Sequence, residues 1–218
     1  MIKIRLCGKI RNSGPMIIPQ GITWQQLIWE YGGGIPGKRE FKMARLGDVF
    51  YTAADLPEPV SPVDDGEIEI FDENSCPLAL SCGWLDEEGG HQALTAFLVK
   101  IRSGKGNESD LASLEDMLRC APKDSFALRR VTDLWNKFEQ EFRLHVTAKL
   151  CPGGVCAGLT RYYISDGCHG CMMCSLNCPA GAISGEPLHQ YIIDQEKCIG
   201  CGKCLRSCKF RAVKKRRS

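Results

Sequence analysis

The chain lacks several features that would assign it to a class at once. Its 218 residues hold 28 Lys and Arg against 26 Asp and Glu, so it has no overall basic excess of the kind that marks nucleic-acid-binding domains. No apolar run approaches the roughly 18 residues that a membrane-spanning helix needs. Residues 1–10 contain neither the apolar segment nor the cleavage site of a secretion signal. We therefore expect a cytoplasmic protein that has no membrane span and binds no nucleic acid.

Cysteine, by contrast, is abundant and unevenly placed. Nine of the 14 cysteines lie between Cys156 and Cys208. A protein that is not exported stays in a reducing compartment, where closely spaced cysteines bind metals more often than they form disulfides. Metal binding is therefore the first expectation, and a disulfide scaffold is the weaker one.

Residues 1–71 have the pattern of a small helix-on-sheet domain. Apolar residues alternate at the start of the chain, and turn residues 12–15 separate them from a second short apolar run. Thr23 and Gln26 form a capping-box pair, and an apolar stripe with helical spacing follows as far as glycines 32–34. Strands are expected over residues 2–6, 16–18, 41–46, 49–52 and 67–71. The order β-β-α-β-β-β predicts an α+β domain.

Residues 72–147 are expected to form a small helical bundle. Apolar stripes with helical spacing run through residues 94–101, 111–118 and 128–142. Amphipathic helices with short connections pack against one another, so three helices are expected between residues 91 and 147. Residues 59–67 and the cysteine-containing stretch 148–166 are the expected linkers.

An internal repeat in residues 167–218 is the strongest signal in the sequence. Two runs share the spacing Cys-x2-Cys-x2-Cys-x3-Cys: the first holds Cys168, Cys171, Cys174 and Cys178, and the second holds Cys198, Cys201, Cys204 and Cys208. Bacterial ferredoxins bind cubane iron–sulfur clusters with this spacing. Three thiolates of each run bind one cluster, and the fourth is carried over to the other cluster.

This crossed arrangement predicts the ligands of two 4Fe-4S clusters. Cys168, Cys171, Cys174 and Cys208 are expected to hold one cluster, and Cys198, Cys201, Cys204 and Cys178 the other. A pair of zinc knuckles is the competing interpretation, but this spacing suits them poorly. Two adjacent clusters without an open iron relay electrons and bind no substrate. We therefore expect a two-cluster ferredoxin domain that exchanges electrons with partner proteins.

A second group of metal-ligating residues follows the last predicted helix. His145 shares an apolar helix face, while Cys151 and Cys156 frame a Pro-Gly-Gly turn just beyond it. Histidine and thiolate suit a structural zinc ion, which needs one more ligand. Cys76 is the preferred fourth ligand, with Cys82 and Cys120 as competitors. The alternatives are a packed histidine beside reduced cysteines, or a further iron–sulfur cluster.

These motifs together resemble the C-terminal half of the NADH-binding flavoprotein subunit of NADH:quinone oxidoreductases and of related bifurcating hydrogenases and formate dehydrogenases. The matching stretches are Gly8-Lys9-Ile10, Pro19-Gln20-Gly21-Ile22-Thr23, Ile101-x2-Gly104-Lys105-Gly106, Phe138-x2-Glu141-Phe142-x2-His145 and Cys151-Pro152-Gly153-Gly154-Val155-Cys156. The resemblance implies an SLBB-type β-grasp domain over residues 1–71 and an iron–sulfur-type bundle over 72–147. It also implies a link over 148–166 that binds zinc in the hydrogenase-type members, and a two-cluster ferredoxin domain over 167–218.

The sequence departs from this family at two points. The family binds FMN and NADH in a glycine-rich region that precedes the β-grasp domain, and no such phosphate-binding loop occurs here, so neither cofactor is expected on this chain. The family's bundle also binds a flavin-proximal cluster through Ser-Cys-Gly-x-Cys-x2-Cys. Here Ser81-Cys82-Gly83 lacks the next two cysteines, so that cluster is expected to be absent, and any binding by Cys82 and Cys120 stays an open question.

The leading hypothesis is an electron-transfer subunit of a cytoplasmic oxidoreductase complex, with catalysis on another chain. It would connect a catalytic subunit with a flavoprotein or a soluble ferredoxin. The competing hypotheses are a degenerate flavoprotein subunit that completes a flavin site with a partner chain, and a scaffold that uses metal only for structure. The basic tip, Lys209, Arg211, Lys214, Lys215, Arg216 and Arg217, is expected to be a solvated, mobile end or else to dock on an acidic partner.

Overall fold

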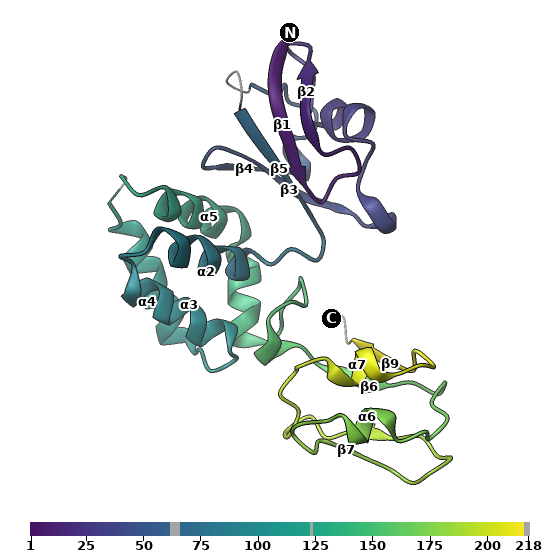
Figure 1. Ribbon diagram of the computed structural model, residues 1–218. Coiled ribbons are helices and arrows are strands. Elements are labelled where there is room, and N and C mark those ends of the chain that lie inside the picture. Colours follow the sequence, from purple (N-terminus) through teal and green to yellow (C-terminus); the bar gives the residue numbers. More distant parts are fainter. Residues whose placement is uncertain (62–65, 123, 216–218) are drawn as a thin grey trace.

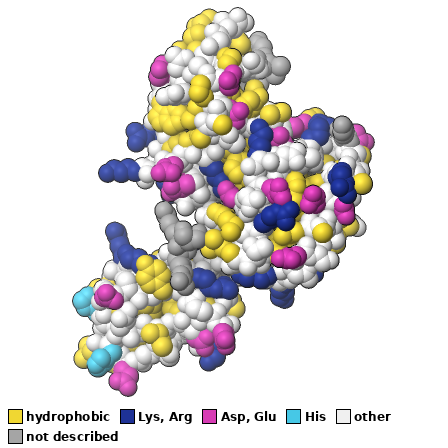
Figure 2. Space-filling model, turned by 180° about the vertical axis from the view of Figure 1, so that it is seen from behind, with side chains coloured by type: hydrophobic (Ala, Val, Ile, Leu, Met, Phe, Trp, Pro, Cys, Tyr) yellow, Lys and Arg dark blue, Asp and Glu magenta, His cyan; other side chains and the backbone are white. Residues whose placement is uncertain are grey.

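Three bodies follow one another along the chain in the computed structural model shown in Figure 1. The structure describes residues 1–61, 66–122 and 124–215. A mixed sheet comes first, a helical bundle second and a small two-layered domain last, and each has its own cluster of buried apolar residues. Seen from behind, the last domain forms a separate lobe (Figure 2). The fold is therefore of the mixed α+β class, as predicted.

The first body is a five-stranded sheet with a short helix. Its elements are β1 (Ile2–Gly8), β2 (Gly14–Ile18), α1 (Trp24–Gln26), η1 (Leu27–Tyr31), η2 (Pro36–Lys38), β3 (Phe41–Leu46), β4 (Val49–Thr52), η3 (Ala53–Asp55) and β5 (Gly66–Asp72). The strand order is β2-β1-β5-β3-β4, in which β1 and β5 are parallel and the other neighbours are antiparallel. Apolar residues at alternate positions of β1 and β5 point into the core beneath the helix.

The predicted helix start is confirmed at atomic detail. The Thr23 hydroxyl accepts a hydrogen bond from the backbone of Gln26, and the Gln26 side chain accepts one from the backbone of Thr23. The helix continues as a single π-helical segment and stops at the predicted glycines, where Gly33 and Gly34 have positive φ. The predicted strands agree with β1 to β5, which begin or end within a few residues of the expected positions. Residues 62–65 of the predicted linker lie outside the described residues.

The second body contains four helices rather than the three expected. They are α2 (Pro77–Glu88), α3 (Gln92–Arg102), α4 (Glu108–Arg119) and α5 (Phe126–Thr147). The last three coincide with the predicted stripes. Helix α2 escaped prediction because its apolar residues do not follow one stripe: Leu85 faces the bundle core, while Trp84 packs against Phe50 of the sheet at a ring distance of 5.5 Å. A helix buried on two sides carries no amphipathic pattern.

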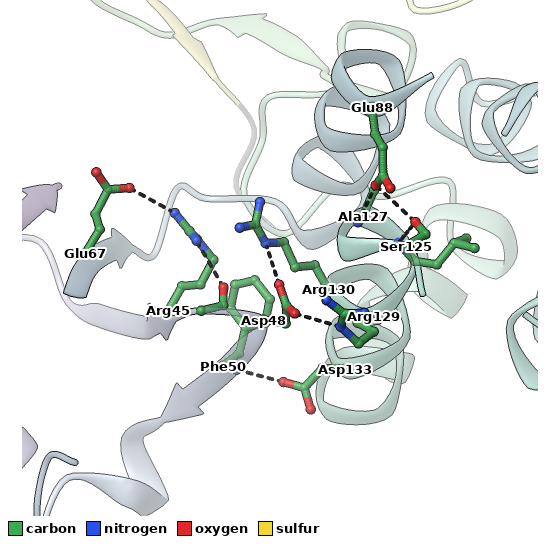
Figure 3. Close-up of polar contacts among 12 residues, drawn as sticks. Arg45, Asp48, Phe50, Glu67, Glu88, Ser125, Ala127, Arg129, Arg130 and Asp133 are labelled. Carbon is green, nitrogen blue, oxygen red and sulfur yellow. Dashed lines mark hydrogen bonds and ion pairs between the residues drawn. The ribbon is translucent and has the colours of Figure 1, made fainter. Parts of the chain in front are cut away.

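Side chains and backbone groups join the sheet to the bundle (Figure 3). Asp48, in the β3–β4 turn, forms ion pairs with Arg129 and Arg130 of α5 at 2.7 and 3.3 Å. The backbone N–H of Phe50 donates to the Asp133 carboxylate at 2.7 Å. Burial raises the pKa of Asp133, and that hydrogen bond partly offsets the effect. The apolar cluster of the bundle also takes in residues of the sheet such as Met43 and Phe71, so these two bodies pack as a unit.

The third body repeats one strand–loop–helix–strand unit. Its elements are η4 (Ala157–Leu159), β6 (Tyr162–Ile164), α6 (Met173–Leu176), β7 (Ile183–Ser184), β8 (Ile192–Ile193), α7 (Lys203–Ser207) and β9 (Val213–Lys215). Strand β6 pairs with β9, and β7 pairs with β8, so each two-stranded sheet joins the two repeats. None of the described helices is long and apolar enough to cross a membrane.

This strand pairing corrects two expectations from the sequence, one about the linker 148–166 and one about the basic tip. The predicted linker 148–166 contains β6, which belongs to the sheet of the last domain. The expectation of a mobile basic tip is wrong for the residues up to Lys215, because strand β9 is paired with β6. The Lys215 side chain is also half-buried beside Gly154. Arg216 and Arg217 lie outside the described residues.

Candidate metal and cluster sites

Four buried ligands meet where the sheet, the bundle and the link join. Cys76 precedes α2, His145 lies in the last turn of α5, and Cys151 and Cys156 lie in the link. One potential ligand atom from each lies within 4.8 Å of all the others, and each side chain is at most 6% exposed. This is the only such group in the described part of the chain. The structure thus brings together the four residues that the sequence singled out, with Cys76 in the place for which Cys82 and Cys120 competed.

The spacing of these atoms fits a tetrahedral ion. The Cys76 Sγ lies 3.3 Å from His145 Nε2 and 3.7 Å from Cys156 Sγ, and Cys156 Sγ lies 3.6 Å from the same nitrogen. An ion with bonds of about 2.3 Å to sulfur and about 2.05 Å to nitrogen would separate its ligands by about 3.8 Å (S–S) and about 3.6 Å (S–N) at tetrahedral angles. With the Cys151 sulfur also within 4.8 Å of the other three atoms, three sulfurs and one nitrogen suit a closed structural site.

The electrostatics of the group favour a positive charge at its centre. Burial by itself lowers the pKa of the His145 imidazole, but hydrogen bonds to the sulfurs of Cys151 and Cys76 outweigh it and raise that pKa to about 10. The pKa of Cys151 is lowered because the Cys156 and Cys76 thiols donate to its sulfur, and the pKa of Cys156 is raised in turn. A bound cation would take the place of these protons and leave thiolates around a neutral imidazole.

Lys42 of β3 forms hydrogen bonds to groups that adjoin two of the four ligands, Cys76 and His145. Lys42 Nζ donates to the carbonyl of Ser75, next to Cys76, and to the Glu141 carboxylate, both at 2.7 Å. The Glu141 carbonyl lies 2.5 Å from His145 Nδ1, so that nitrogen is the donor and Nε2 is free to bind a metal. The sequence offered no signal for Lys42, because only the fold brings β3 to α5.

The link is seated against the turn that carries Cys76. An added Cβ at Gly153 would lie 2.9 Å from the Asn74 carbonyl oxygen and 3.0 Å from the Cys76 nitrogen, so only glycine allows this approach. The turn is fixed by the Asp72 carboxylate, which accepts hydrogen bonds from the Asn74 backbone at 3.1 Å and from the Ser75 hydroxyl at 3.3 Å. Glycine and aspartate therefore set the distance between two chain segments that supply ligands.

The two other cysteines of the bundle lie apart from this group. Cys82 is buried within α2, and burial raises its pKa to about 11. Cys120 is exposed at the end of α4. All 14 cysteines lie within the described residues, and none of them forms a disulfide.

The eight remaining cysteines of the last domain line two separate cavities. The first cavity is lined by Cys168, Cys171, Cys174 and Cys208, and the second by Cys178, Cys198, Cys201 and Cys204. Each cavity thus receives three cysteines from one run and the fourth from the other run, which is the grouping expected from the spacing. Apolar side chains such as Ile183 and Val213 surround the cysteines, and burial raises the pKa values of Cys174 and Cys204. A thiolate-binding metal would be needed to keep such thiols ionised.

Backbone N–H groups at equivalent positions of the two repeats donate hydrogen bonds to equivalent cysteine sulfurs. The N–H of Ala182 donates to Cys178 Sγ at 3.3 Å, and the N–H of Ala212 donates to Cys208 Sγ at 3.2 Å. The glycines at 170 and 200 both have positive φ, of 64° and 66°, and let the loops turn tightly between the first two cysteines. N–H to sulfur hydrogen bonds lower the electron density on a cluster's sulfurs and are one way in which a protein sets a potential.

One protein-family model matches the last domain. Residues 167–213 match the family described as "4Fe-4S dicluster domain". This family binds two clusters by its description, and its range contains all eight cysteines of the two cavities.

Longer relatives cover the rest of the chain. The NADP-reducing hydrogenase subunit HndC of Solidesulfovibrio fructosivorans is 30% identical over 95% of this chain and 49% of its own length. An NADH-quinone oxidoreductase subunit of Streptomyces coelicolor is 27% identical over 67% of this chain and 39% of its own length. The chain therefore spans half or less of the relatives it matches, and the predicted resemblance to one half of such a subunit is confirmed.

A solved structure supports the fold. A chain in the crystal structure of an NAD+-reducing NiFe hydrogenase in the H2-reduced state has a TM-score of 0.55 and 18% identity. The match covers 66% of this chain and 29% of that chain. At this level of identity the likeness concerns the arrangement of helices and strands.

Proposed function

We propose that this chain is an electron-transfer subunit of a multi-subunit oxidoreductase and relays electrons through two 4Fe-4S clusters in residues 167–218. The observation that carries the proposal is the crossed sorting of eight cysteines around two cavities, three from one run and one from the other. That sorting is the ligand pattern of bacterial two-cluster ferredoxins. The dicluster family match supports the cofactor type, and the hydrogenase and NADH-quinone oxidoreductase relatives support the class of complex.

The chain's own residues would hold the clusters and set their access to partners. Cys168, Cys171, Cys174 and Cys208 would bind the first cluster, and Cys198, Cys201, Cys204 and Cys178 the second. The clusters supply one-electron chemistry. Cys171 and Cys201 are exposed, while Cys174 and Cys204 are buried, so each site has one edge near solvent and one toward the interior.

The four-ligand group at Cys76, His145, Cys151 and Cys156 would hold a structural zinc ion. Its support is the ligand set, the burial and the near-tetrahedral spacing of the ligand atoms. Zinc has no redox chemistry, and four protein ligands leave no position for substrate. Its role would be to fasten the link, and through it the cluster-binding domain, to the bundle.

The first two bodies would serve as a docking platform. We assign residues 1–71 to an SLBB-like β-grasp domain and residues 72–147 to the helical bundle, with the link over 148–166. The strand order β2-β1-β5-β3-β4 with a helix on one face supports the β-grasp assignment. The expected partners are a catalytic subunit on one side and a flavoprotein or soluble ferredoxin on the other, in the cytoplasm.

Metal analysis of anaerobically purified protein tests the proposal. We expect roughly eight iron atoms with matching acid-labile sulfide, four for each cluster, and one zinc per chain. Dithionite should bleach the visible absorbance and produce an EPR signal. Colourless protein that stays EPR-silent after dithionite would contradict the electron-relay function. Bound flavin that is lost on substitution within this chain would favour the alternative of a flavoprotein subunit.

A further inference from the structure

The two repeats of the cluster-binding domain differ in charge. Residues 162–185 contain no Lys or Arg and one acidic residue, Asp166. The equivalent residues 192–215, thirty positions later, contain seven Lys and Arg and two acidic residues. A shared backbone fold therefore carries two different surfaces.

Two of these seven cations lie on the short helix beside the second cavity, where the first repeat has apolar residues. In the second repeat α7 carries Lys203 and Arg206, and in the first repeat α6 has Met173 and Leu176 at the same positions. Both basic side chains are exposed, and so are Met173 and Leu176, at 38% and 73%. None of these positions builds the core, so neither the packing nor the helix requires a cation there.

The basic residues of α7 lie at the rim of the second cavity. Lys203 and Ile199 line that cavity together with Cys201, which is itself exposed. The Arg206 guanidinium donates to the Cys201 carbonyl at 3.4 Å, which holds its charge over the same loop. Ile199 is 57% exposed and gives the rim an apolar centre. We call Ile199, Lys203 and Arg206, together with the exposed Cys201, the α7 face.

We propose that the α7 face is the docking surface for a small acidic electron-carrier protein of the ferredoxin class, and that the second cluster is the one that exchanges electrons with it. The inference rests on the proposed function. A small apolar centre flanked by cations matches transient electron-transfer contacts, which are small and rely on charge complementarity. Positive charge beside the exposed edge of a cluster steers an anionic partner to the point where its electron can cross.

The test uses the complete, cluster-loaded chain and a plant-type acidic 2Fe-2S ferredoxin as the probe. Stopped-flow mixing of reduced ferredoxin with the oxidised chain gives the bimolecular rate across a range of salt concentrations. Two double variants are compared, K203Q/R206Q on α7 and M173E/L176E on α6. Both change the net charge by the same amount, at equivalent positions of the two repeats.

We expect K203Q/R206Q to lower the low-salt rate roughly tenfold and to flatten its salt dependence, because steering by charge accelerates association by about this factor or more. M173E/L176E should change the rate less than twofold. Equal effects of the two variants, or a wild-type rate that does not fall as salt rises, would overturn the proposal.

Two controls separate this result from other causes. Reduced methyl viologen, a cation, should reduce K203Q/R206Q no more slowly than the wild type. If both donors slow down alike, the cations tune the cluster potential and the docking proposal is wrong. Iron content and the dithionite EPR signal should be unchanged in both variants, and their absence in the wild-type chain would mean instead that the proposed function itself has failed.

Discussion

The fourth cysteine of each run in the last domain lines the cavity that receives three cysteines of the other run. Cys208 closes the second run but lines the first cavity with Cys168, Cys171 and Cys174. We expect Cys208→Ser to remove the first cluster, so that iron falls from roughly eight to roughly four atoms per chain. Cys174→Ser should leave the same remaining EPR spectrum, while Cys178→Ser should leave the other one. If Cys208→Ser and Cys204→Ser gave the same remaining spectrum, the crossed ligand assignment would be wrong.

Asp72 is the residue that holds the turn before Cys76. Burial alone would raise the pKa of its carboxyl, but hydrogen bonds from Arg39, the Asn74 backbone and Ser75 outweigh this and lower it. A carboxyl whose pKa is lowered by folding stabilises the fold at every pH above its unfolded pKa, about 3.9. The stabilisation is lost only as the pH falls below that value and through the folded pKa.

We therefore expect Asp72→Asn to lower the free energy of unfolding by about 2 kcal/mol, because the Arg39 guanidinium loses the negatively charged oxygen that accepts its hydrogen bond. The loss should be the same at pH 5 and pH 8, measured as the thermal unfolding midpoint by near-ultraviolet circular dichroism. Asp116→Asn, on the exposed surface of α4, is the matched control and should cost at most about 0.5 kcal/mol. The loss should shrink as the pH falls from about 4 toward about 2, and a loss that stays constant over that range would show that the Asp72 pKa is not lowered.

At the scale of elements, β3 reaches the four-ligand group through one side chain. Lys42 holds the Ser75 carbonyl and the Glu141 carboxylate, and its own side chain is only 10% exposed. Groups that orient metal ligands from outside typically change metal affinity 10- to 100-fold when removed. We expect Lys42→Met to weaken zinc binding by roughly tenfold or more, measured by competition with a chromophoric chelator.

Lys137→Met is the matched control for this prediction. Lys137 also joins α5 to the sheet, where its Nζ donates to the Phe50 carbonyl, but it contacts none of the four ligands. It should destabilise the contact between sheet and bundle and leave zinc affinity within about twofold of the wild type. Equal zinc affinities of the two variants would mean that Lys42 does not position the ligands.

Elements were predictable where a local pattern specifies them. The capping pair at Thr23 and the glycines after η1 mark both helix ends in the sequence itself. Helix α2 and strand β6 were not predictable in this way. The first is apolar on two faces, and the second is three residues long and finds its partner β9 about fifty positions away. Such elements are specified by tertiary contacts, which no short window of sequence contains.

The same distinction applies to the sites. Regular spacing allows the eight cysteines of the proposed clusters to be identified from the sequence, because three ligands of a cubane cluster come from one tight loop. His145, Cys151 and Cys156 were also close enough in sequence to suggest a site. Their fourth partner Cys76 lies 69 positions before His145. The sequence preferred it but kept Cys82 and Cys120 as competitors, and the packing of α2 on α5 decides between them.

At the scale of the whole molecule, the four-ligand group lies where the cluster-binding domain meets the rest. Two of its members belong to the link, so a zinc ion bound there as proposed would restrain the segment between α5 and β6, and its removal would release that segment. Local opening exposes backbone to proteases in proportion to the population of the open state. We therefore expect chelation of zinc to accelerate tryptic cleavage after Lys149 and Arg161, which lie within the link on either side of Cys151 and Cys156, at least tenfold.

Cleavage after Arg119 provides an internal control for this experiment. That residue is exposed at the end of α4 and makes its ion pair within the same helix, so its cleavage should change less than twofold. The visible absorbance of the clusters should persist, because the eight cysteines proposed to hold the clusters are separate from the four residues proposed to hold zinc. Uniform acceleration at all sites would point to general unfolding, and unchanged cleavage at Lys149 and Arg161 would mean that the ion does not fasten the link. Preferential cleavage within the link, with the clusters intact, is the pattern expected if a metal ion fastens the link between two otherwise independent folding units.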